Sequence, residues 1–237
     1  MFGGKQVFPT VLDWYPSDTL ERFRKLSQEH QDYWNSLPPI KYHLNKYNFR
    51  SPEFPEKETR DSITFLGCSQ TFGLGMHKDK TWASLVANHF NLPEINLSVP
   101  GGSLDSAFRV YNEWQPIHKS KITCLLIPPD NRFESRDYTD KKDIYKWKNM
   151  GWWSVENEGK LSDDAKEIIL HMLSPEVQEV RVDRNLAAIK YIAQQNESKL
   201  IIIRNNLGYD KARDGAHGGI EWNRKIADEF IGKINES

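Results

Sequence analysis

The sequence contains only two cysteines, Cys68 and Cys124, and both lie inside apolar runs that are typical of strands. A disulfide framework is therefore not expected, and a reducing compartment is favoured. No stretch approaches the roughly 18 consecutive apolar residues of a membrane span, and the amino terminus lacks a basic start followed by an apolar run. The sequence predicts a soluble, cytoplasmic protein with no signal peptide and no membrane contact.

An excess of charge of either sign is also lacking. Lysine and arginine together number 32 against 33 aspartates and glutamates, which gives a net charge of -1 over 237 residues. Such a chain has no overall field that would concentrate it on nucleic acid or on an anionic membrane. We therefore expect no nucleic-acid partner and no polyanionic substrate.

The chain divides into two regions of different character. Residues 1–60 are rich in aromatics, proline and charge, with one amphipathic helix predicted at about 17–35, and we interpret them as an N-terminal extension. In residues 61–237, short apolar runs alternate with helical stretches, and a polar, tryptophan-rich insertion occupies about 130–175. The predicted strands are 63–66, 95–99, 122–127 and 200–203, and the predicted helices are 81–90, 104–114, 175–196 and 219–234. This alternation is typical of a three-layer α/β/α sandwich around a central parallel sheet.

The stretch SITFLGCSQTFGLG, residues 62–75, ends a predicted strand on a glycine, a cysteine and a serine. In a parallel α/β sheet the functional crevice lies beyond the carboxyl ends of the strands, where Ser69 would emerge. The glycines of this stretch allow a tight turn, and the Ser69 amide can point into the crevice as an oxyanion donor. A plain strand-to-helix turn with a serine cap explains the same pattern equally well.

Two further stretches contain candidate functional residues. ARDGAHGG places Asp214 and His217 three residues apart, a spacing that lets a carboxylate orient an imidazole for proton transfer near neutral pH. Without Ser69, the simpler interpretation is a carboxylate at a helix start and a surface histidine. NLSVPGGS ends a strand in a turn with free backbone amides, which alone is an ordinary turn with Ser103 as a helix cap.

In chain order, the stretch at 62–75, then NLSVPGGS and finally DGAH resemble motif blocks of the SGNH, or GDSL-like, hydrolases, and the likeness covers residues 62–235. The resemblance implies a flavodoxin-like α/β/α fold, with FLGCSQTFGLG presenting Ser69 as the nucleophile and Cys68 at the usual aspartate position. It implies that Asp214 and His217 complete a triad and that Gly101 donates to the oxyanion. The third block of this family is usually Gly-x-Asn-Asp, whereas residues 128–131 of this chain are Pro-Pro-Asp-Asn. The resemblance therefore implies that Asn131 is an oxyanion donor shifted by one place.

The activity implied by this resemblance is ester hydrolysis through an acyl-enzyme on Ser69, with no metal and no cofactor. A small acyl group such as O-acetyl on a carbohydrate is the favoured substrate. Trp147, Trp152 and Trp153 are candidates for a wall that packs on a sugar ring, and packing beneath a long loop is the equal alternative.

A second hypothesis is that the fold persists without catalysis, as a binding or structural module. Residues 1–60 would then dock on another protein or on a second copy of the chain. YNFRSPEF, residues 47–54, resembles the lead-in of SGNH-like proteins from bacteria and their viruses, which adds a viral-particle component to the locations compatible with the sequence.

Overall fold

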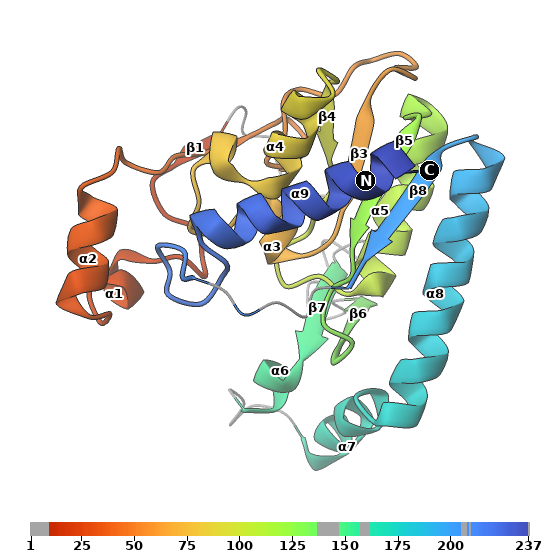
Figure 1. The fold of residues 1–237 in the computed structure, drawn as a ribbon. Coiled ribbons are helices and arrows are strands. Elements are labelled where there is room, and N and C mark those ends of the chain that lie inside the picture. Colours follow the sequence, from red (N-terminus) through yellow and green to blue (C-terminus); the bar gives the residue numbers. More distant parts are fainter. Residues whose placement is uncertain (1–9, 137–146, 157–161, 205–207, 209, 237) are drawn as a thin grey trace.

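The structure, a computed structural model, describes residues 10–136, 147–156, 162–204, 208 and 210–236. Its centre is a four-stranded sheet in the order β4-β3-β5-β8, in which every neighbouring pair is parallel (Figure 1). The strands are β3 (Ile63–Leu66), β4 (Glu94–Asn96), β5 (Ile122–Leu126) and β8 (Lys199–Ile203). The four predicted strands are confirmed, with ends that differ by at most three residues.

Helices cover both faces of this sheet (Figure 1). One face carries α4 (Trp82–His89) and α9 (Ile220–Glu236), and the other carries α5 (Leu104–His118) and α8 (Pro175–Gln195). Side chains of β3 alternate between the two cores: Phe65 packs with Trp82 on one face, whereas Leu66 packs with Val110 on the other. Strands buried on both sides explain the unbroken apolar runs in the sequence, and the predicted three-layer α/β/α sandwich is confirmed.

The described part of residues 1–60 packs against this sandwich. It contains β1 (Thr10–Leu12), α1 (Leu20–Phe23), α2 (Gln28–Asn35) and β2 (Tyr42–Leu44), and residues 1–9 lie outside the described range. The single helix predicted at 17–35 was wrong, because the Ser27 side chain accepts from the His30 amide and begins a second helix. Phe49 and Phe54 belong to the same buried cluster as Leu66 of the central sheet.

The predicted insertion at about 130–175 contains a hairpin of β6 (Arg132–Arg136) and β7 (Trp147–Gly151), followed by α6 (Trp152–Glu156) and α7 (Asp163–Met172). Residues 137–146 and 157–161 of this insertion lie outside the described range. Four buried side chains form a separate small core there: Phe133, Met150, Ile169 and Leu173. Figure 1 shows the hairpin beyond the arrowhead of β8, at the carboxyl edge of the sheet.

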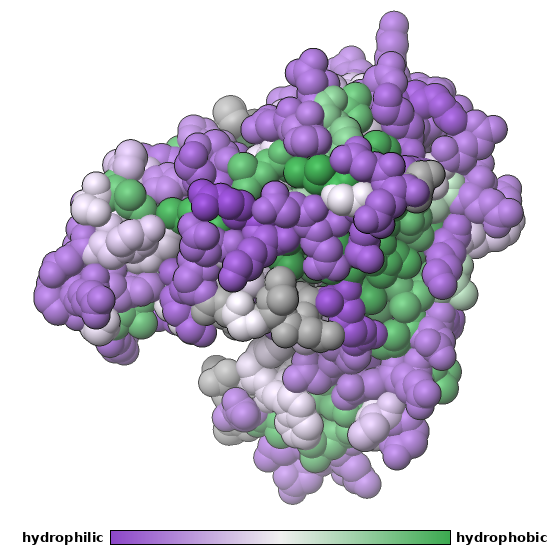
Figure 2. Space-filling view, in the orientation of Figure 1, coloured by the Kyte–Doolittle hydropathy of each residue, from purple (hydrophilic) through white to green (hydrophobic). Residues whose placement is uncertain are grey.

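The surface seen in Figure 2 is mostly hydrophilic, with a hydrophobic band between α9 and α8 where β8 lies. Leu200 and Ile202 of β8 contribute to this band because they are only partly covered, whereas Ile201 and Ile203 are buried. Among the described residues, no helix has both the length and the apolar character needed to cross a bilayer.

Candidate active site

The nucleophile candidate lies at the carboxyl edge of the sheet, as the sequence predicts. Ser69 is the first residue of α3 (Ser69–Phe72), a four-residue helix that begins three residues after β3 ends. The chain after β4 continues beside this point, because the Val99 amide donates to the Gly67 carbonyl at 3.1 Å. The turn that contains Gly101 therefore starts at the same edge as Ser69.

Ser69, His217 and Asp214 form one hydrogen-bonded chain. The Ser69 hydroxyl lies 2.7 Å from His217 Nε2, and His217 Nδ1 lies 2.5 Å from Asp214 Oδ2. The other carboxylate oxygen, Oδ1, accepts from the main-chain amides of Ala216 at 3.1 Å and His217 at 3.0 Å. One oxygen of Asp214 thus holds the loop while the other orients the imidazole. The structure brings together the three residues that the sequence singled out for a triad.

The protonation state of Asp214 follows from these contacts. Its side chain is fully buried, and burial by itself would raise the pKa of the carboxyl. The hydrogen bond and charge of His217, together with the two main-chain amides, outweigh burial and hold the pKa of Asp214 below its usual value. Asp214 is therefore a carboxylate at neutral pH and can stabilise an imidazolium on His217.

Gly75 allows the nucleophile loop to touch the base loop. Its φ of +71° lies in the left-handed region, and its carbonyl accepts from the Arg213 amide at 3.0 Å. A Cβ atom at this position would lie 2.9 Å from the Cβ of Ala212 and 3.0 Å from the main-chain nitrogens of Arg213 and Asp214. The glycine is needed because the two backbones meet here.

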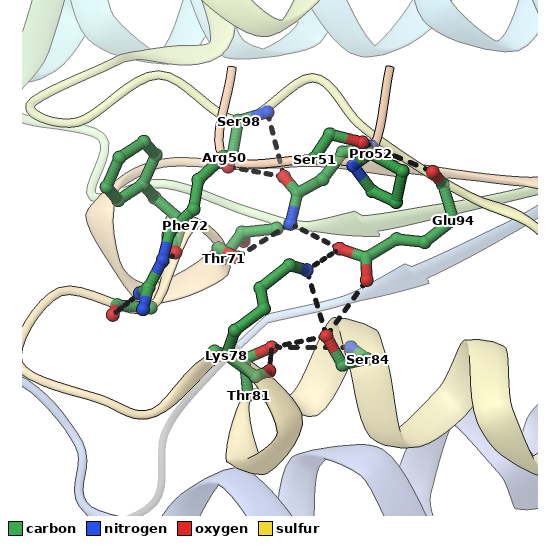
Figure 3. Close-up of polar contacts among 12 residues, drawn as sticks. Arg50, Ser51, Pro52, Thr71, Phe72, Lys78, Thr81, Ser84, Glu94 and Ser98 are labelled. Atoms are coloured by element: carbon green, nitrogen blue, oxygen red, sulfur yellow. Dashed lines mark hydrogen bonds and ion pairs between the residues drawn. The ribbon is translucent and has the colours of Figure 1, made fainter. Parts of the chain in front are cut away.

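A polar cluster holds the short helix that begins at Ser69 (Figure 3). Arg50 donates to the carbonyls of Phe72, at 3.3 Å, and Met76, at 2.7 Å, and Asn96 donates to the Thr71 carbonyl at 3.1 Å. The carbonyls of Thr71 and Phe72 lie at the carboxyl end of a helix too short to be stable alone, and that of Met76 lies in the loop that follows it. Burial lowers the pKa of Arg50 to about 10, so the guanidinium stays charged at neutral pH.

The same cluster contains a partly buried ion pair. Figure 3 shows Lys78 and Glu94 in contact, with Ser84 between them: its hydroxyl accepts from Lys78 Nζ and donates to Glu94 Oε2, both at 2.9 Å. Asn96 joins this pair to α3, because its amide also donates to Glu94 Oε1 at 3.1 Å. The cluster therefore links the end of β4 to the helix that carries the nucleophile.

The N-terminal segment supports the base loop through a second ion pair, which is buried. Arg213, next to Asp214 in the chain, donates to the fully buried carboxylate of Asp18, and the Tyr42 hydroxyl donates to that carboxylate as well. The Arg213 guanidinium also lies 4.0 Å from the ring centroid of Trp14. Residues from the described part of 1–60 thus fix the residue that precedes the triad aspartate.

We expect Asp18→Ala to lower the free energy of unfolding by about 3–5 kcal/mol, because it leaves Arg213 buried without its carboxylate. Denaturant unfolding measures this change. Asp79→Ala is the matched control, since the Asp79 side chain is 68% exposed and its ion pair with Lys80 lies at the surface. A loss for Asp18→Ala no larger than that of the control would contradict the structural role given to the pair.

A cavity of about 500 Å³ opens in front of the triad. Its wall contains Ser69 and His217. The other wall residues come from the carboxyl ends of three central strands, from the hairpin and from the loop of His217: Cys68, Gln70, Leu126, Ile127, Pro128, Pro129, Arg132, Arg204 and Ala216. A space of this size is typical of a small-molecule site. The structure thus gives the triad direct access to a ligand.

Two of the predicted oxyanion donors, the amides of Ser69 and Gly101, differ in their position relative to the cavity. Within the described residues, the main-chain amides of Ser69 and Gly101 donate to no protein acceptor. Ser69 lies on the cavity wall, whereas Gly101, with φ of +72°, lies in the turn after β4 and is not among the wall residues. The Ser69 amide is therefore available beside its own hydroxyl, and a role for Gly101 stays a prediction.

Asn131 is not brought to the cavity. It lies in an exposed bend, while its neighbours Pro129 and Arg132 contribute to the cavity wall. Asp130 is turned toward Arg204, with its Oδ2 accepting at 2.6 Å from Nη1. Neither Asp130 nor Asn131 lines the space beside Ser69, so the shifted third donor expected from the sequence has no support in this arrangement.

We expect Asn131→Ala to leave kcat for ester hydrolysis within about threefold of the unmodified protein, because the side chain lies away from the reacting atoms. Loss of a true oxyanion donor costs about 100-fold or more. Steady-state kinetics on p-nitrophenyl acetate decides between the two. A loss of 100-fold would place Asn131 in the oxyanion hole after all.

Alternation of side chains along an extended chain predicts that Cys68 points away from Ser69. The structure shows that it does not. Its sulfur lies 3.9 Å from the Ser69 hydroxyl, and Cys68 lines the same cavity. The reason is that the chain leaves the extended conformation at Ser69, where α3 begins. The imidazole of His217 is nevertheless bonded to the Ser69 hydroxyl.

The three tryptophans predicted to form a substrate wall are not among the residues that line the cavity. Trp147 lies between two guanidinium groups, those of Arg109 at 5.0 Å and Arg136 at 5.2 Å from its ring centroid. Trp152 is 45% exposed, and Trp153 packs against the guanidinium of Arg132 at 5.3 Å. Trp153 therefore supports a cavity residue, while the role of all three toward a sugar stays a prediction.

Sequence reasoning missed three polar residues of the cavity wall, namely Gln70, Arg132 and Arg204. Gln70 fixes the base loop, because its side-chain oxygen accepts from the Gly218 amide at 3.0 Å. Arg132 and Arg204 bring two guanidinium groups to the wall. The position of Gln70 directly after the nucleophile was a usable signal, whereas nothing in the sequence placed the two arginines together. In the described part of the chain, no group of three histidine, cysteine, aspartate or glutamate side chains is arranged to hold a metal ion.

No protein-family model and no curated protein matches this chain. Among solved structures, it is similar to a G-D-S-L family lipolytic protein from Desulfitobacterium hafniense, with 10% identity, a TM-score of 0.36 and 74% of each chain covered. It is similar to the esterase EstA from Pseudoalteromonas sp., with 13% identity, a TM-score of 0.36 and coverage of 74% of this chain and 97% of that one. It is also similar to the acetyl xylan esterase Est2A from Butyrivibrio proteoclasticus, with 12% identity, a TM-score of 0.42 and coverage of 78% and 65%. The parallel four-stranded sheet with helices on both faces agrees with the three-layer α/β/α fold that the sequence predicted.

Proposed function

We propose that this protein is a serine ester hydrolase that removes a small acyl group, such as acetyl, from a carbohydrate or a similar small ester. The observation that carries the proposal is the continuous chain from the Ser69 hydroxyl through His217 to Asp214, at the wall of a cavity. A serine alone is a weak nucleophile, and a base within hydrogen-bond reach that is itself oriented by a carboxylate is the arrangement that activates it.

In the first half of the reaction, the Ser69 oxygen attacks the ester carbonyl carbon while His217 Nε2 takes its proton. The carbonyl oxygen becomes an oxyanion, which the Ser69 amide and, as predicted, the Gly101 amide would stabilise. The intermediate then collapses: the bond to the alcohol oxygen breaks, and the imidazolium returns its proton to that oxygen. The acyl group remains as an ester on Ser69.

In the second half, water attacks the acyl-enzyme carbonyl carbon and gives its proton to His217 Nε2. The bond to the Ser69 oxygen breaks, the serine regains its proton, and the carboxylic acid leaves. Asp214 keeps one imidazole orientation throughout, because its carboxylate accepts from Nδ1 at 2.5 Å and is itself fixed by two main-chain amides. Each half-reaction thus uses the same three side chains.

The test is labelling with a fluorophosphonate, a reagent that phosphonylates an activated serine. We expect one label per chain, mapped to Ser69 by peptide analysis, in folded protein only. His217→Ala should not be labelled, because the serine then has no base. Ser36→Ala, which removes a serine from the exposed end of α2, should be labelled like the unmodified chain. Labelling at another residue, or none in folded protein, would contradict the proposal.

One observation favours the alternative of an inactive binding module, namely the position of Asn131 outside the cavity. Such a module would keep the fold and the cavity but lack enough oxyanion stabilisation for turnover. Absence of labelling, together with ligand binding in the cavity, is the result that this alternative predicts.

We expect kcat/KM to rise with pH along a single acid limb, because only the neutral imidazole of His217 can accept the Ser69 proton. Asp214 should add no second inflection near neutral pH, since the lowered pKa of its carboxyl keeps it ionised there. A pH–rate profile with a neutral ester measures this. Two acid inflections, or a rate that falls as the imidazole loses its proton, would contradict the role of general base given to His217.

A further inference from the structure

The cavity in front of Ser69 contains two arginines that ester hydrolysis does not require. Arg132 comes from the start of β6 in the insertion, and Arg204 directly follows β8 of the central sheet. Their side chains meet the same space as the nucleophile although they are 72 residues apart in the chain. Two guanidinium groups at one wall favour a ligand with negative charge.

Arg132 is distinguished by donors that are buried and unused. Its Nε and Nη1 are shielded from solvent, and neither has a hydrogen-bond partner within the described residues. A buried donor without an acceptor costs free energy, and more so when it carries charge. An acceptor supplied by a ligand would remove that cost.

Three other arginines around the hairpin and the cavity mouth have carboxylate partners. Arg109 binds Glu134 through two hydrogen bonds of 2.7 and 2.8 Å. In the remaining two pairs, Arg181 binds Asp105, and Arg204 binds Asp130 at 2.6 Å. Asp130 thus bonds Arg204, and Nε and Nη1 of Arg132 stay without an acceptor among the described residues.

Arg132 is also held in place. Its main-chain carbonyl accepts from Arg181 Nη2 at 3.0 Å, and its guanidinium packs over the ring of Trp153 at 5.3 Å. The attraction between a guanidinium and an aromatic ring favours this position of the group, and its fork matches the two oxygens of a carboxylate or a phosphate. The group is thus positioned before a ligand arrives.

We propose that the ester cleaved at Ser69 carries one anionic group, a carboxylate or a phosphate, which Arg132 binds with Arg204 as the second contact. This inference rests on the proposed function, because it names the class of ester that the same site accepts. One anionic group next to an acyl group describes an acidic sugar or a sugar phosphate that bears an ester. The near-neutral net charge of the chain is compatible with such a substrate, since a local pair of arginines provides the attraction.

The test compares matched esters: an O-acetylated methyl glucuronoside, its carboxyl methyl ester, and an O-acetylated sugar phosphate. For the unmodified protein we expect kcat/KM to be about 10- to 100-fold higher for the anionic esters than for the neutral one. The carboxylate and phosphate arms distinguish the two sources of charge. Equal rates on all three esters would overturn the proposal.

Arg132→Gln should remove this preference by raising KM for the anionic esters, while the neutral ester keeps its kcat/KM within about threefold. Arg136→Gln is the matched control, because Arg136 lies on the same strand, packs on Trp147 and is exposed. A loss of kcat of about 100-fold on every ester would overturn the subsite and make Arg132 an oxyanion donor instead.

Failure of the subsite and failure of the proposed function are separable. Binding of methyl glucuronoside and of glucose phosphate to Ser69→Ala, measured by calorimetry, tests the subsite without turnover. We expect binding that Arg132→Gln weakens by at least tenfold, and no binding by Ser69→Ala would overturn the subsite. Fluorophosphonate labelling of the unmodified chain, run in parallel, tests the nucleophile alone.

Discussion

Replacing Ser69 with alanine is expected to lower kcat for ester hydrolysis by about 10⁶-fold, because the attacking atom is lost. The hydroxyl is 2.7 Å from His217 Nε2, so its removal leaves the base without the group that it activates. Steady-state kinetics on p-nitrophenyl acetate measures the loss. Ser36→Ala should leave kcat unchanged, because Ser36 only bonds the Tyr33 carbonyl at the end of α2.

His217→Ala should cost about as much as Ser69→Ala, and the double variant should lose no more than either single one. Residues that act as one unit are not additive, because removal of either member already removes the activated nucleophile. Additive losses would mean that the two residues act independently. Residual activity above about one per cent in Ser69→Ala would move the nucleophile elsewhere, and Cys68, which lines the same cavity, would be the first residue to examine.

The residues that could be predicted from the sequence are those whose signal is local. β3 followed by Ser69, and Asp214 three residues before His217, are short patterns with a direct physical meaning, and the structure brings them together. The alternation of apolar runs and helices likewise predicted the sheet, because each strand is buried on both faces.

The supports of the site could not be predicted, because they depend on contacts between distant parts of the chain. Asp18 and Arg213 are 195 residues apart, and no local pattern around Asp18 indicates that it forms a buried ion pair. The part of residues 1–60 that the structure describes looked appended by composition, yet its Arg50 binds the carbonyls that follow the nucleophile.

Local sequence patterns also could not predict which side chains of a loop face the cavity. Asn131 was expected in the cavity because the family motif has an asparagine nearby, whereas the chain after β5 presents Pro128, Pro129 and Arg132 to that space. Trp147 was expected to offer a free ring face, but guanidinium groups lie over it. The composition of the insertion pointed to tryptophans as candidate contacts for a sugar. It could not show that other side chains of the protein already pack on their rings.

Asp214→Asn is expected to lower kcat by about 10⁴-fold while the fold is kept. The asparagine oxygen can still accept from the amides of Ala216 and His217, which hold the carboxylate at 3.1 and 3.0 Å in the native chain. Its NH₂ group then faces His217 Nδ1, which must accept rather than donate. The proton moves to Nε2, and the imidazole can no longer take the proton of Ser69.

The matched control is Asp210→Asn, because Asp210 also accepts from two main-chain amides, those of Glu221 at 3.2 Å and Trp222 at 2.9 Å, but contacts no histidine within the described residues. We expect it to keep kcat within about threefold. The lowered pKa of Asp214 adds a second readout: its ionised form contributes stability above the usual aspartate pKa, and that contribution is lost as the pH falls through the folded-state value. Asp214→Asn should therefore be less stable than the native chain near neutral pH, with the difference shrinking in acid. If Asp214→Asn retained nearly full activity, the carboxylate would serve only to hold the loop, and the base would need another partner.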